Sequence, residues 1–565
     1  MKKAQAVLAF MLAAVTAFTA TGCGASSSAV AEPEPTPTAT AEPTPEPPAP
    51  QPALNVMLES PVETLDPQLA ADSASFEIIT DLMDGLLQMD ADGTVSPALA
   101  ESYDVSEDGL TYTFHLRSDA LWANGDAVTA ADFVFAWQRA VDPATKSPYA
   151  YLFSDVAQIQ NAAEIRSGLL PATELGVTAV NSTTLQVVLN VPVSSLPSLL
   201  CLPVFYPVNQ AFYTACADTF GTSPDTFLSN GAFALASYEP DAPAFELTKN
   251  DSYYDVGRIQ LTGLNYYVVQ DSEQALANYQ AGTLDVAAVA GEQVDAVLND
   301  AAHQPTSTGT LWSLYLNQNS DYVLTSQNMR SALMFAIDRD SLCSDTLKNG
   351  STAARTIVPA QAVFNADGTD FTADSDALAD ICSYDPDKAA ECYEAVKSLF
   401  GLDSLTLELL ADADDVPQKT AQAIKEQLES TLPGLTIRIV SEPKAQRLQD
   451  VQAGNFQLAL VDVRADYTDA AAYLTAWTDA NNTNGWYNAD YDALLASCTA
   501  GELSADAEGR WNALHDAQRM LLEDAAVLPL YQLTRAQLVR PGYVTGIAFA
   551  HVGIACPYKD AVIQG

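Results

Sequence analysis

Residues 96–143 read SPALAESYDVSEDGLTYTFHLRSDALWANGDAVTAADFVFAWQRAVDP. The stretch TYTFHLR at 111–117 alternates between apolar and polar side chains, which predicts a half-buried strand. A helical run ends at AWQRAVDP, and Thr129 stands where its N-cap belongs. NGD at 124–126 predicts a tight turn, because glycine accepts a positive φ and Asx side chains bond the nearby backbone. The stretch therefore predicts a strand, a turn and an amphipathic helix, a combination that many folds contain.

The order of residues within this stretch is more specific than its secondary structure. It reads P-x-L-A-E-S-Y, then T-Y-T-F-x-L-R, then W-x-N-G-D-x-V-T-A-x-D-F-V-F-A-W-x-R-x-x-D-P, and the pattern continues to Ala150. It resembles the oligopeptide-binding proteins of bacterial ABC importers, family 5 of the extracellular solute-binding proteins. Later stretches, such as NGAFALASYEP at 230–240 and the closing AAVLPLYQL at 525–533, extend the resemblance from residue 54 to about residue 550.

The resemblance implies an α/β protein with a two-lobe periplasmic-binding-protein-like fold, of type II and the large peptide-binding class, with an extra inserted subdomain. The length agrees, because a chain of this size exceeds what one hydrophobic core usually holds. The family pattern predicts three regions: lobe I from residues 54–87, 201–265 and 528–565, the inserted subdomain from 88–200, and lobe II from 266–527.

The first residues predict export and tethering. Residues 1–23 carry two lysines, an apolar run too short for a membrane span, and Ala20-Thr21-Gly22-Cys23, which is similar to a bacterial lipobox. Cys23 is thus the expected lipidation site, although Ala20 replaces the usual leucine; an ordinary secretory signal with an incidental cysteine is the alternative. Residues 24–52 are rich in Pro, Glu, Thr and Ala and predict an extended, disordered linker, or equally an O-glycosylated stalk.

Composition excludes several classes of function. A formal net charge of −47 would repel phosphate backbones and anionic headgroups, which argues against nucleic-acid binding and against membrane contact beyond the anchor. The eight cysteines include no C-x-x-C pair and the four histidines are scattered, so we expect neither a metal site nor a cofactor. With Cys23 lipidated, the other seven cysteines are odd in number, and small buried thiols with at most one disulfide are expected.

The most informative stretch for ligand binding is FQLALVDVRADYTDAAAYL at 456–474, an apolar strand that breaks at Ala465, Asp466 and Tyr467. In the family that the chain resembles, the aspartate of A-D-Y holds the α-ammonium of the peptide, so the resemblance implies that role for Asp466. Val463, Arg464 and Ala465 would then offer backbone groups to an extended ligand as an added strand. The alternative is structural: Asp466 begins a helix together with Thr468 and Asp469.

A second ligand edge is expected in the other lobe, where Ala71, Asp72 and Ser73 align with the family's second peptide-contacting segment. The chain departs from the family where Asp462 and Val463 replace a Gly-Trp pair, which removes one aromatic pocket wall. Arg464 adds a cation near Asp466; it either pairs with that aspartate or holds a ligand carboxylate. Because no basic residue matches the family's partners for the peptide carboxyl end, the preferred ligand length stays open.

The function that the resemblance implies is that of a substrate-binding lipoprotein on the outer face of the cell membrane. It would capture short peptides as a monomer and deliver them to the permease subunits and ATPases of an importer. A nickel chelate, haem or a glycan as ligand, or a role as a peptide sensor, are the alternatives within the class. An acyl-transfer enzyme is a remote alternative: Ser441 and Lys444 satisfy S-x-x-K, but its companion motifs are absent and Pro443 interrupts the required helix. We therefore expect no enzymatic activity.

Overall fold

The computed structural model describes residues 52–90, 92–291, 293–365, 367–373, 378, 380–547, 549 and 558–564. All of them belong to one compact unit, Pro50–Gly565. The expected signal peptide with its lipidation site Cys23, residues 24–51 of the expected linker, and Cys556 lie outside the described residues. The anchor and the linker therefore stay predictions.

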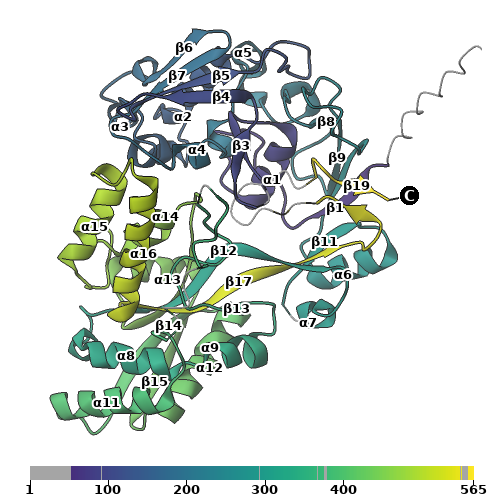
Figure 1. Ribbon diagram of the computed structural model, residues 1–565. Helices are drawn as coiled ribbons and strands as arrows, with labels where there is room; N and C mark the ends of the chain where they lie inside the picture. The colour runs from purple at the N-terminus through teal and green to yellow at the C-terminus, as the bar shows by residue number, and fades with distance from the viewer. Residues whose placement is uncertain are drawn as a thin grey trace, which may run out of the picture. The chain divides into compact units, whose positions relative to one another are not determined.

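One mixed sheet of eleven strands runs through this unit. In order across the sheet the strands are β15 (Leu435–Glu442), β14 (Leu405–Asp412), β16 (Leu458–Arg464), β12 (His303–Leu316), β17 (Val527–Val539), β11 (Val286–Val289), β1 (Leu54–Leu58), β10 (Gly263–Val268), β9 (Ala244–Lys249) and β8 (Phe233–Ser237), with β13 (Thr352–Ala353) paired to β17. The longest strands, β12 and β17, pair antiparallel from His303↔Leu538 to Tyr315↔Val527. Figure 1 shows them side by side, leading from the region of β14 toward β11. They connect the two halves of the fold.

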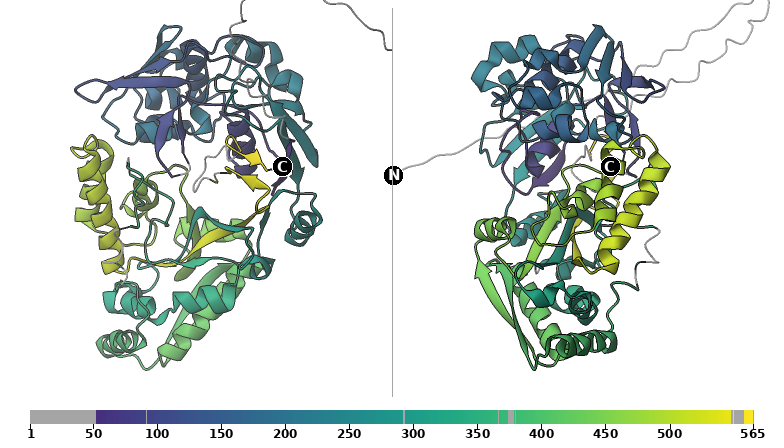
Figure 2. Two further views of the ribbon diagram at one scale, coloured as in Figure 1. Left: turned by 45° about the vertical axis from the view of Figure 1, so that its right-hand side comes forward. Right: turned by 90° about the vertical axis from the view of Figure 1, so that its left-hand side faces the viewer.

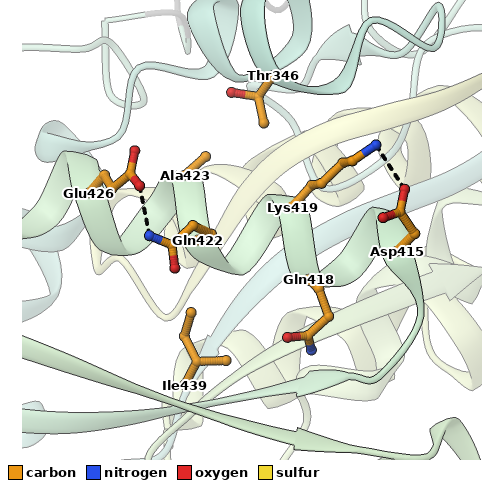
Figure 3. A pocket seen from close by; sticks show the side chains of 8 residues that line it. All are labelled: Thr346, Asp415, Gln418, Lys419, Gln422, Ala423, Glu426 and Ile439. Carbon is orange, nitrogen blue, oxygen red and sulfur yellow. Dashed lines mark hydrogen bonds and ion pairs between the residues drawn. The ribbon is translucent and has the colours of Figure 1, made fainter. Parts of the chain in front are cut away.

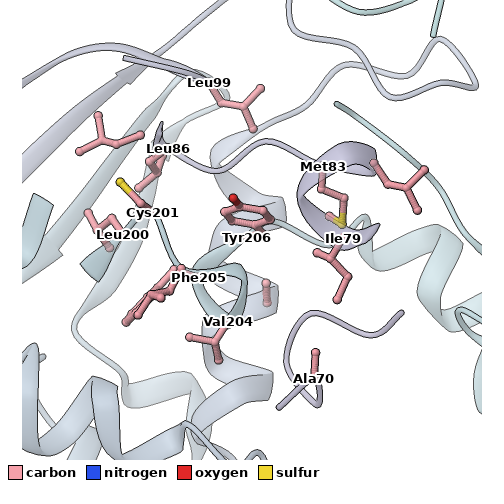
Figure 4. Close-up of a cluster of buried hydrophobic side chains, with 14 of the residues drawn as sticks. Ala70, Ile79, Met83, Leu86, Leu99, Leu200, Cys201, Val204, Phe205 and Tyr206 are labelled. Atoms are coloured by element: carbon pink, nitrogen blue, oxygen red, sulfur yellow. The ribbon is translucent and has the colours of Figure 1, made fainter. Parts of the chain in front are cut away.

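The first half has one hydrophobic core, to which residues 54–87, 88–200 and 201–261 all contribute. Its second sheet has the order β4 (Ala100–Val105), β5 (Thr111–Leu116), β7 (Thr184–Val188) and β6 (Val177–Asn181). Trp137 of helix α2 (Ala130–Val141) is fully buried, and its Nε1 donates to the carbonyl oxygen of Phe205 at 2.8 Å. Figure 4 shows part of this core, with Phe205 and Tyr206 near Ile79 of helix α1 (Ser73–Leu82).

The opening stretch of the sequence folds as predicted. Strand β5 buries Tyr112, Phe114 and Leu116 and leaves the alternate residues half-exposed. In the turn, Gly125 has φ +88°, which an L-residue with a side chain rarely adopts. Thr129 precedes α2, and its backbone N–H and hydroxyl donate to the Asp132 carboxylate at 2.8 and 3.0 Å. These elements are fixed by local interactions, which is why the sequence alone predicts them.

A second hydrophobic core, from Leu311 to Tyr531, forms the other half of the fold. The helices of this half are α8 (Gln327–Ala336), α9 (Arg339–Ser341), α11 (Pro386–Phe400), α12 (Asp415–Thr431), α13 (Lys444–Ala453), α14 (Ala470–Leu474), α15 (Ala489–Ala500) and α16 (Ala507–Glu523). Met329 and Leu333 of α8 are fully buried, and so is Ile337, its C-cap. Both views of Figure 2 show α15 and α16, the paired yellow helices, packed side by side.

A third, small hydrophobic cluster accompanies the two large cores. It joins α6 (Ser272–Ala281) and α7 (Gln293–Val297) to β11 and to Ala536 and Leu538 at the far end of β17. Val286 of β11 belongs to the first core, whereas most other buried apolar residues of 269–302 belong to this small cluster. The domain boundaries given above stay a prediction. Shorter elements complete the fold: β2 (Leu87–Met89), β3 (Val95–Pro97), α3 (Ala162–Arg166), α4 (Leu196–Leu199), α5 (Gln210–Cys216), β18 (Val544–Thr545) and β19 (Val562–Ile563).

Three findings concern the described residues as a whole. None of their helices combines the length and the apolar character that a membrane crossing requires. Within the same residues, no group of three His, Cys, Asp or Glu side chains is placed to bind a metal ion. The cysteines of the described part of the chain are free thiols: Cys201, Cys216, Cys343, Cys382, Cys392 and Cys498.

Candidate ligand-binding site

The site predicted from the sequence lies where strand β16 ends. This strand pairs with β12 from Leu458↔Leu316 to Arg464↔Thr310, and residues 458–461 are buried. After these residues the side chains of the strand become more exposed to solvent: Val463 is half-buried, and Arg464 is exposed. Strand β16 stops at Arg464 as predicted, because the next residues turn away from β12 toward helix α14.

Asp466 is exposed in this turn and does not cap the helix that follows. The cap is Asp469, whose carboxylate accepts a hydrogen bond from the backbone N–H of Ala471 at 2.8 Å. Arg510 also binds both oxygens of Asp469, at 3.0 and 2.8 Å. The structural alternative for Asp466 is therefore wrong, since Asp469 has that role and leaves Asp466 free for another.

The Asp466 carboxylate instead meets a tyrosine from the first half of the fold. The hydroxyl of Tyr151, just before the π-helix Leu152–Val156, donates to Oδ2 of Asp466 at 2.5 Å. Burial, together with the bond to Asp466 and its negative charge, raises the pKa of Tyr151, so the phenol stays a donor at neutral pH. Oδ1 of Asp466 has no hydrogen-bond partner within the described part of the chain.

Arg464 reaches the other predicted edge of the site. Its Nη1 donates to Oγ of Ser73, the first residue of α1, at 3.1 Å. Arg464 makes no ion pair with Asp466 among the described residues, so the first of its two sequence-based alternatives is not observed. The structure thus brings residues 463–467 and 71–73 together, although they are far apart in the sequence.

Asp72 has a local role at this edge. Its Oδ1 caps α1 by accepting from the backbone N–H of Ser75 at 2.8 Å. Its Oδ2 is buried and has no hydrogen-bond partner in the described structure. A buried carboxylate oxygen without a donor is costly, which makes this atom one that a ligand donor would satisfy. The neighbouring Ala71 is exposed.

Two further predicted residues hold the turn in place. Ala465 is 6% exposed and lies in the second core together with Tyr473, whose hydroxyl donates to the carbonyl oxygen of Gly309 at 2.8 Å. Tyr467 packs against the core of the first half, and burial followed by the charge of Asp469 raises its pKa. Tyr467 is thus a contact between the two halves, and not only a neighbour of Asp466.

Sequence reasoning missed two tyrosines, Tyr149 and Tyr151. The ring of Tyr149 lies 5.9 Å from that of Phe76 on α1 and 6.4 Å from that of Tyr151. Burial and the charges of Asp466 and Asp72 raise the pKa of Tyr149, and Arg464 opposes this effect. The family pattern quoted from the sequence ends at Ala150, between these two residues. The two tyrosines follow Pro148 and are separated by one residue, and this spacing was the sequence signal that could have identified them.

The departures from the family pattern have structural uses. Asp462 binds Nη2 of Arg447 at 2.6 Å and Nζ of Lys444 at 2.8 Å. Arg447 is fully buried and also pairs with Asp412 at 2.9 and 3.0 Å.

Ser441 lies on β15 and Lys444 begins α13, with Pro443 as its N-cap, so the two do not share a helix face. The S-x-x-K motif therefore lacks the geometry of an acyl-transfer site.

Asp66, in the loop that precedes the second edge, is likewise structural. It is 5% exposed, and Nη1 of Arg139 on α2 donates to its Oδ1 at 2.8 Å. The guanidinium of Arg139 also lies over the ring of Tyr213, 4.4 Å from its centroid. The Asp66–Arg139 pair therefore ties the loop before α1 to helix α2.

A groove elsewhere on the molecule differs from this site. It has a volume of ≈ 480 Å³ and lies along α12 beside the edge strand β15. As Figure 3 shows, its polar side chains pair along the helix, Lys419 with Asp415 at 2.8 Å and Gln422 with Glu426 at 2.6 Å. They are satisfied locally and do not converge on a ligand, so the groove is not the candidate site.

Two cores joined by long strands of one sheet, with polar side chains of both halves meeting beside a strand end, define a two-lobe solute-binding protein. Residues 94–485 match the family model described as "Bacterial extracellular solute-binding proteins, family 5 Middle". The chain belongs to family 5 of the bacterial extracellular solute-binding proteins.

Known proteins that are similar to the chain agree with this assignment. It is 31% identical over 529 residues to a dipeptide-binding protein of Lactococcus lactis subsp. cremoris, covering 89% of this chain and 93% of the relative. Listeria monocytogenes OppA bound to peptide is 30% identical with a TM-score of 0.68, over 91% of this chain and 99% of that one. The periplasmic murein tripeptide-binding protein MppA, in its unliganded open form, is 25% identical with a TM-score of 0.76, over 91% and 97%.

Proposed function

We propose that this chain is the substrate-binding component of an ABC importer, which captures short peptides between its lobes and presents them to a permease. The observation that carries the proposal is Asp466: an exposed carboxylate at the end of β16, not used as a helix cap, with one oxygen open. The peptide-related names of the similar proteins support it. No catalytic role is proposed for any residue.

In this proposal Asp466 holds the α-ammonium of the peptide. A hydrogen bond between such charged groups contributes about 1.5–3 kcal/mol. The open Oδ1 receives the ammonium, while Tyr151 keeps Oδ2 oriented. The backbone of residues 463–465 then pairs with the extended peptide, and residues 71–73 of lobe I approach its other side. Main-chain pairing binds peptides of many sequences, because it does not use their side chains.

Ligand capture in such a protein requires movement of the lobes. A ligand favours closure only through contacts that it gains with both lobes. The TM-score with the open MppA exceeds that with peptide-bound OppA although the sequence identity is lower, which supports an arrangement nearer to an open form. The register shifts of β12 against β17 between Ser307 and Thr310, beside Gly309 with φ +66°, offer a place for the hinge.

The cellular setting is part of the same proposal. Acylation of Cys23 would anchor the chain to the outer face of the cell membrane, and residues 24–52 would let the binding unit reach the permease. The binding unit would act as a monomer, with permease subunits and their ATPases as protein partners and short peptides as ligands.

The test is calorimetry with trialanine and N-acetyl-trialanine on the wild type and Asp466→Asn. We expect the wild type to bind trialanine at least about tenfold more tightly than the acetylated peptide, and Asp466→Asn to remove that difference. Asp387→Asn, an exposed change of the same kind on α11, is the matched control and should keep it. Recovery of the intact peptide separates binding from hydrolysis. Equal losses for both peptides in Asp466→Asn would overturn the assignment of Asp466.

A further inference from the structure

Arg464 differs from the other arginines in its partners. Every arginine of the chain except Arg339 and Arg464 forms an ion pair with an Asp or Glu side chain among the described residues. Arg339 is buried and donates to main-chain carbonyl groups. Arg464 is exposed, and its partner is a neutral hydroxyl. In a chain with 72 acidic and 25 basic residues, an exposed guanidinium without a carboxylate partner points to a ligand that supplies one.

The contact with Ser73 leaves most of the guanidinium available. Nη1 of Arg464 donates to Ser73 Oγ at 3.1 Å, which uses one of the five N–H donors of an arginine side chain. Its planar fork matches a carboxylate, with two parallel hydrogen bonds. Because Arg464 lies in lobe II and Ser73 in lobe I, an anion bound by both groups would contact both lobes.

The charges around this position suit a zwitterion. Asp466, Asp72 and Arg464 all act on the Tyr149 hydroxyl, so two anions and one cation share this space. Arg464 ends β16 and Asp466 lies two residues further, in the turn toward α14, so their Cα atoms are at most about 7 Å apart. An extended dipeptide separates its ammonium from its carboxylate by about the same length.

We propose that Arg464, together with the Ser73 hydroxyl, binds a carboxylate carried by the second residue of the ligand. The inference rests on the proposed function, in which Asp466 fixes the ligand's amino end. It specifies the substrate class as dipeptides, through their terminal carboxylate, or as longer peptides with Asp or Glu at the second position. Both present the same group to the guanidinium.

Calorimetry with two pairs of peptides tests the proposal. Dialanine against dialanine amide reports the terminal carboxylate, and Ala-Asp-Ala-Ala against Ala-Asn-Ala-Ala, both amidated, reports the side chain. We expect the wild type to prefer the carboxylate member of at least one pair by about 10- to 100-fold. Arg464→Gln should remove that preference and retain affinity for the neutral member, and Arg464→Lys should keep part of it, because lysine lacks the fork.

Arg519→Gln is the control, because it removes the same charge from an exposed arginine on α16 that pairs with Asp516. It should leave the preference unchanged. Two results would overturn the role of Arg464 and leave the proposed function standing. In one, the wild type binds these peptides without preferring the carboxylate member of either pair; in the other, the preference survives in Arg464→Gln. A wild type that binds none of the four peptides would overturn both.

Discussion

The hydroxyl of Tyr151 donates to Oδ2 of Asp466 at 2.5 Å, although the two residues stand 315 positions apart in the sequence. The bond links the segment before the π-helix Leu152–Val156, in the first half of the fold, to the turn after β16 in the second half. Two further hydrogen bonds connect the lobes: Arg464 donates to Ser73, and the backbone N–H of Ser194 donates to the carbonyl oxygen of Ser504. Together the three bonds hold the two lobes in the arrangement described.

Tyr151→Phe should therefore loosen the ligand-free protein. The change removes only the hydroxyl, and a hydrogen bond of this kind contributes about 1 kcal/mol, or roughly a fivefold shift in a two-state equilibrium. Distances between spin labels on the two lobes should shift toward wider separation, and a saturating peptide should reverse the shift. Tyr322→Phe, an exposed tyrosine of lobe II, is the control. An unchanged distance distribution in Tyr151→Phe would show that the bond does not restrain the lobes.

Arg447→Met should destabilise the protein by about 3–5 kcal/mol, because it leaves the carboxylate of Asp412 buried without its partner. Both side chains are almost fully inaccessible to solvent. Urea unfolding measures the loss. The double substitution Arg447→Met with Asp412→Leu should cost less than the single one, because it removes both charges; a larger cost would contradict this explanation.

Glu77 on α1 should make stability depend on pH. Burial first, and then the negative charge of Asp81, raise its pKa from 4.5 to about 8, while Arg535 opposes the effect. Between these two values the folded chain keeps a proton that the unfolded chain releases, so unfolding free energy falls as pH rises through this window. Above the upper value the loss is complete. Glu59 and Tyr558 also act on this carboxyl.

Glu77→Gln replaces the protonated form with a neutral isostere and should flatten this dependence. The stability of the variant relative to the wild type should increase by about 3.5 kcal/mol between pH ~5 and pH ~8, as urea unfolding at both values would measure. Parallel curves for the two proteins would show that Glu77 does not titrate in this window.

Local elements could be predicted from the sequence because their causes are local. Strand β5, the turn at Gly125 and the cap at Thr129 depend on side-chain alternation, a positive φ and one short-range pair of hydrogen bonds. The two-lobe fold was implied by the family resemblance, and the structure confirms it. The sequence also allowed Asp466 to begin a helix together with Thr468 and Asp469, and only the structure shows that Asp469 is the cap of α14.

The remaining parts of the site depend on contacts that no local pattern encodes. The sequence shows Arg464 two residues before Asp466, but the choice between Asp466 and Ser73 as its partner depends on how the lobes meet. Tyr151 stands 315 positions from Asp466, and its role follows only from the packing of the first half of the fold against the turn after β16. Similarly, the buried pairing of Asp462 with Arg447 explains why a charged residue is tolerated there.

The most direct measurement is a crystal structure of the protein with a bound short peptide that has a free amino end. We predict the peptide nitrogen within about 2.7–3.2 Å of a carboxylate oxygen of Asp466, with the peptide backbone hydrogen-bonded to residues 463–465. A peptide bound with its amino end directed away from Asp466, or bound outside the space between residues 463–467 and 71–73, would contradict it.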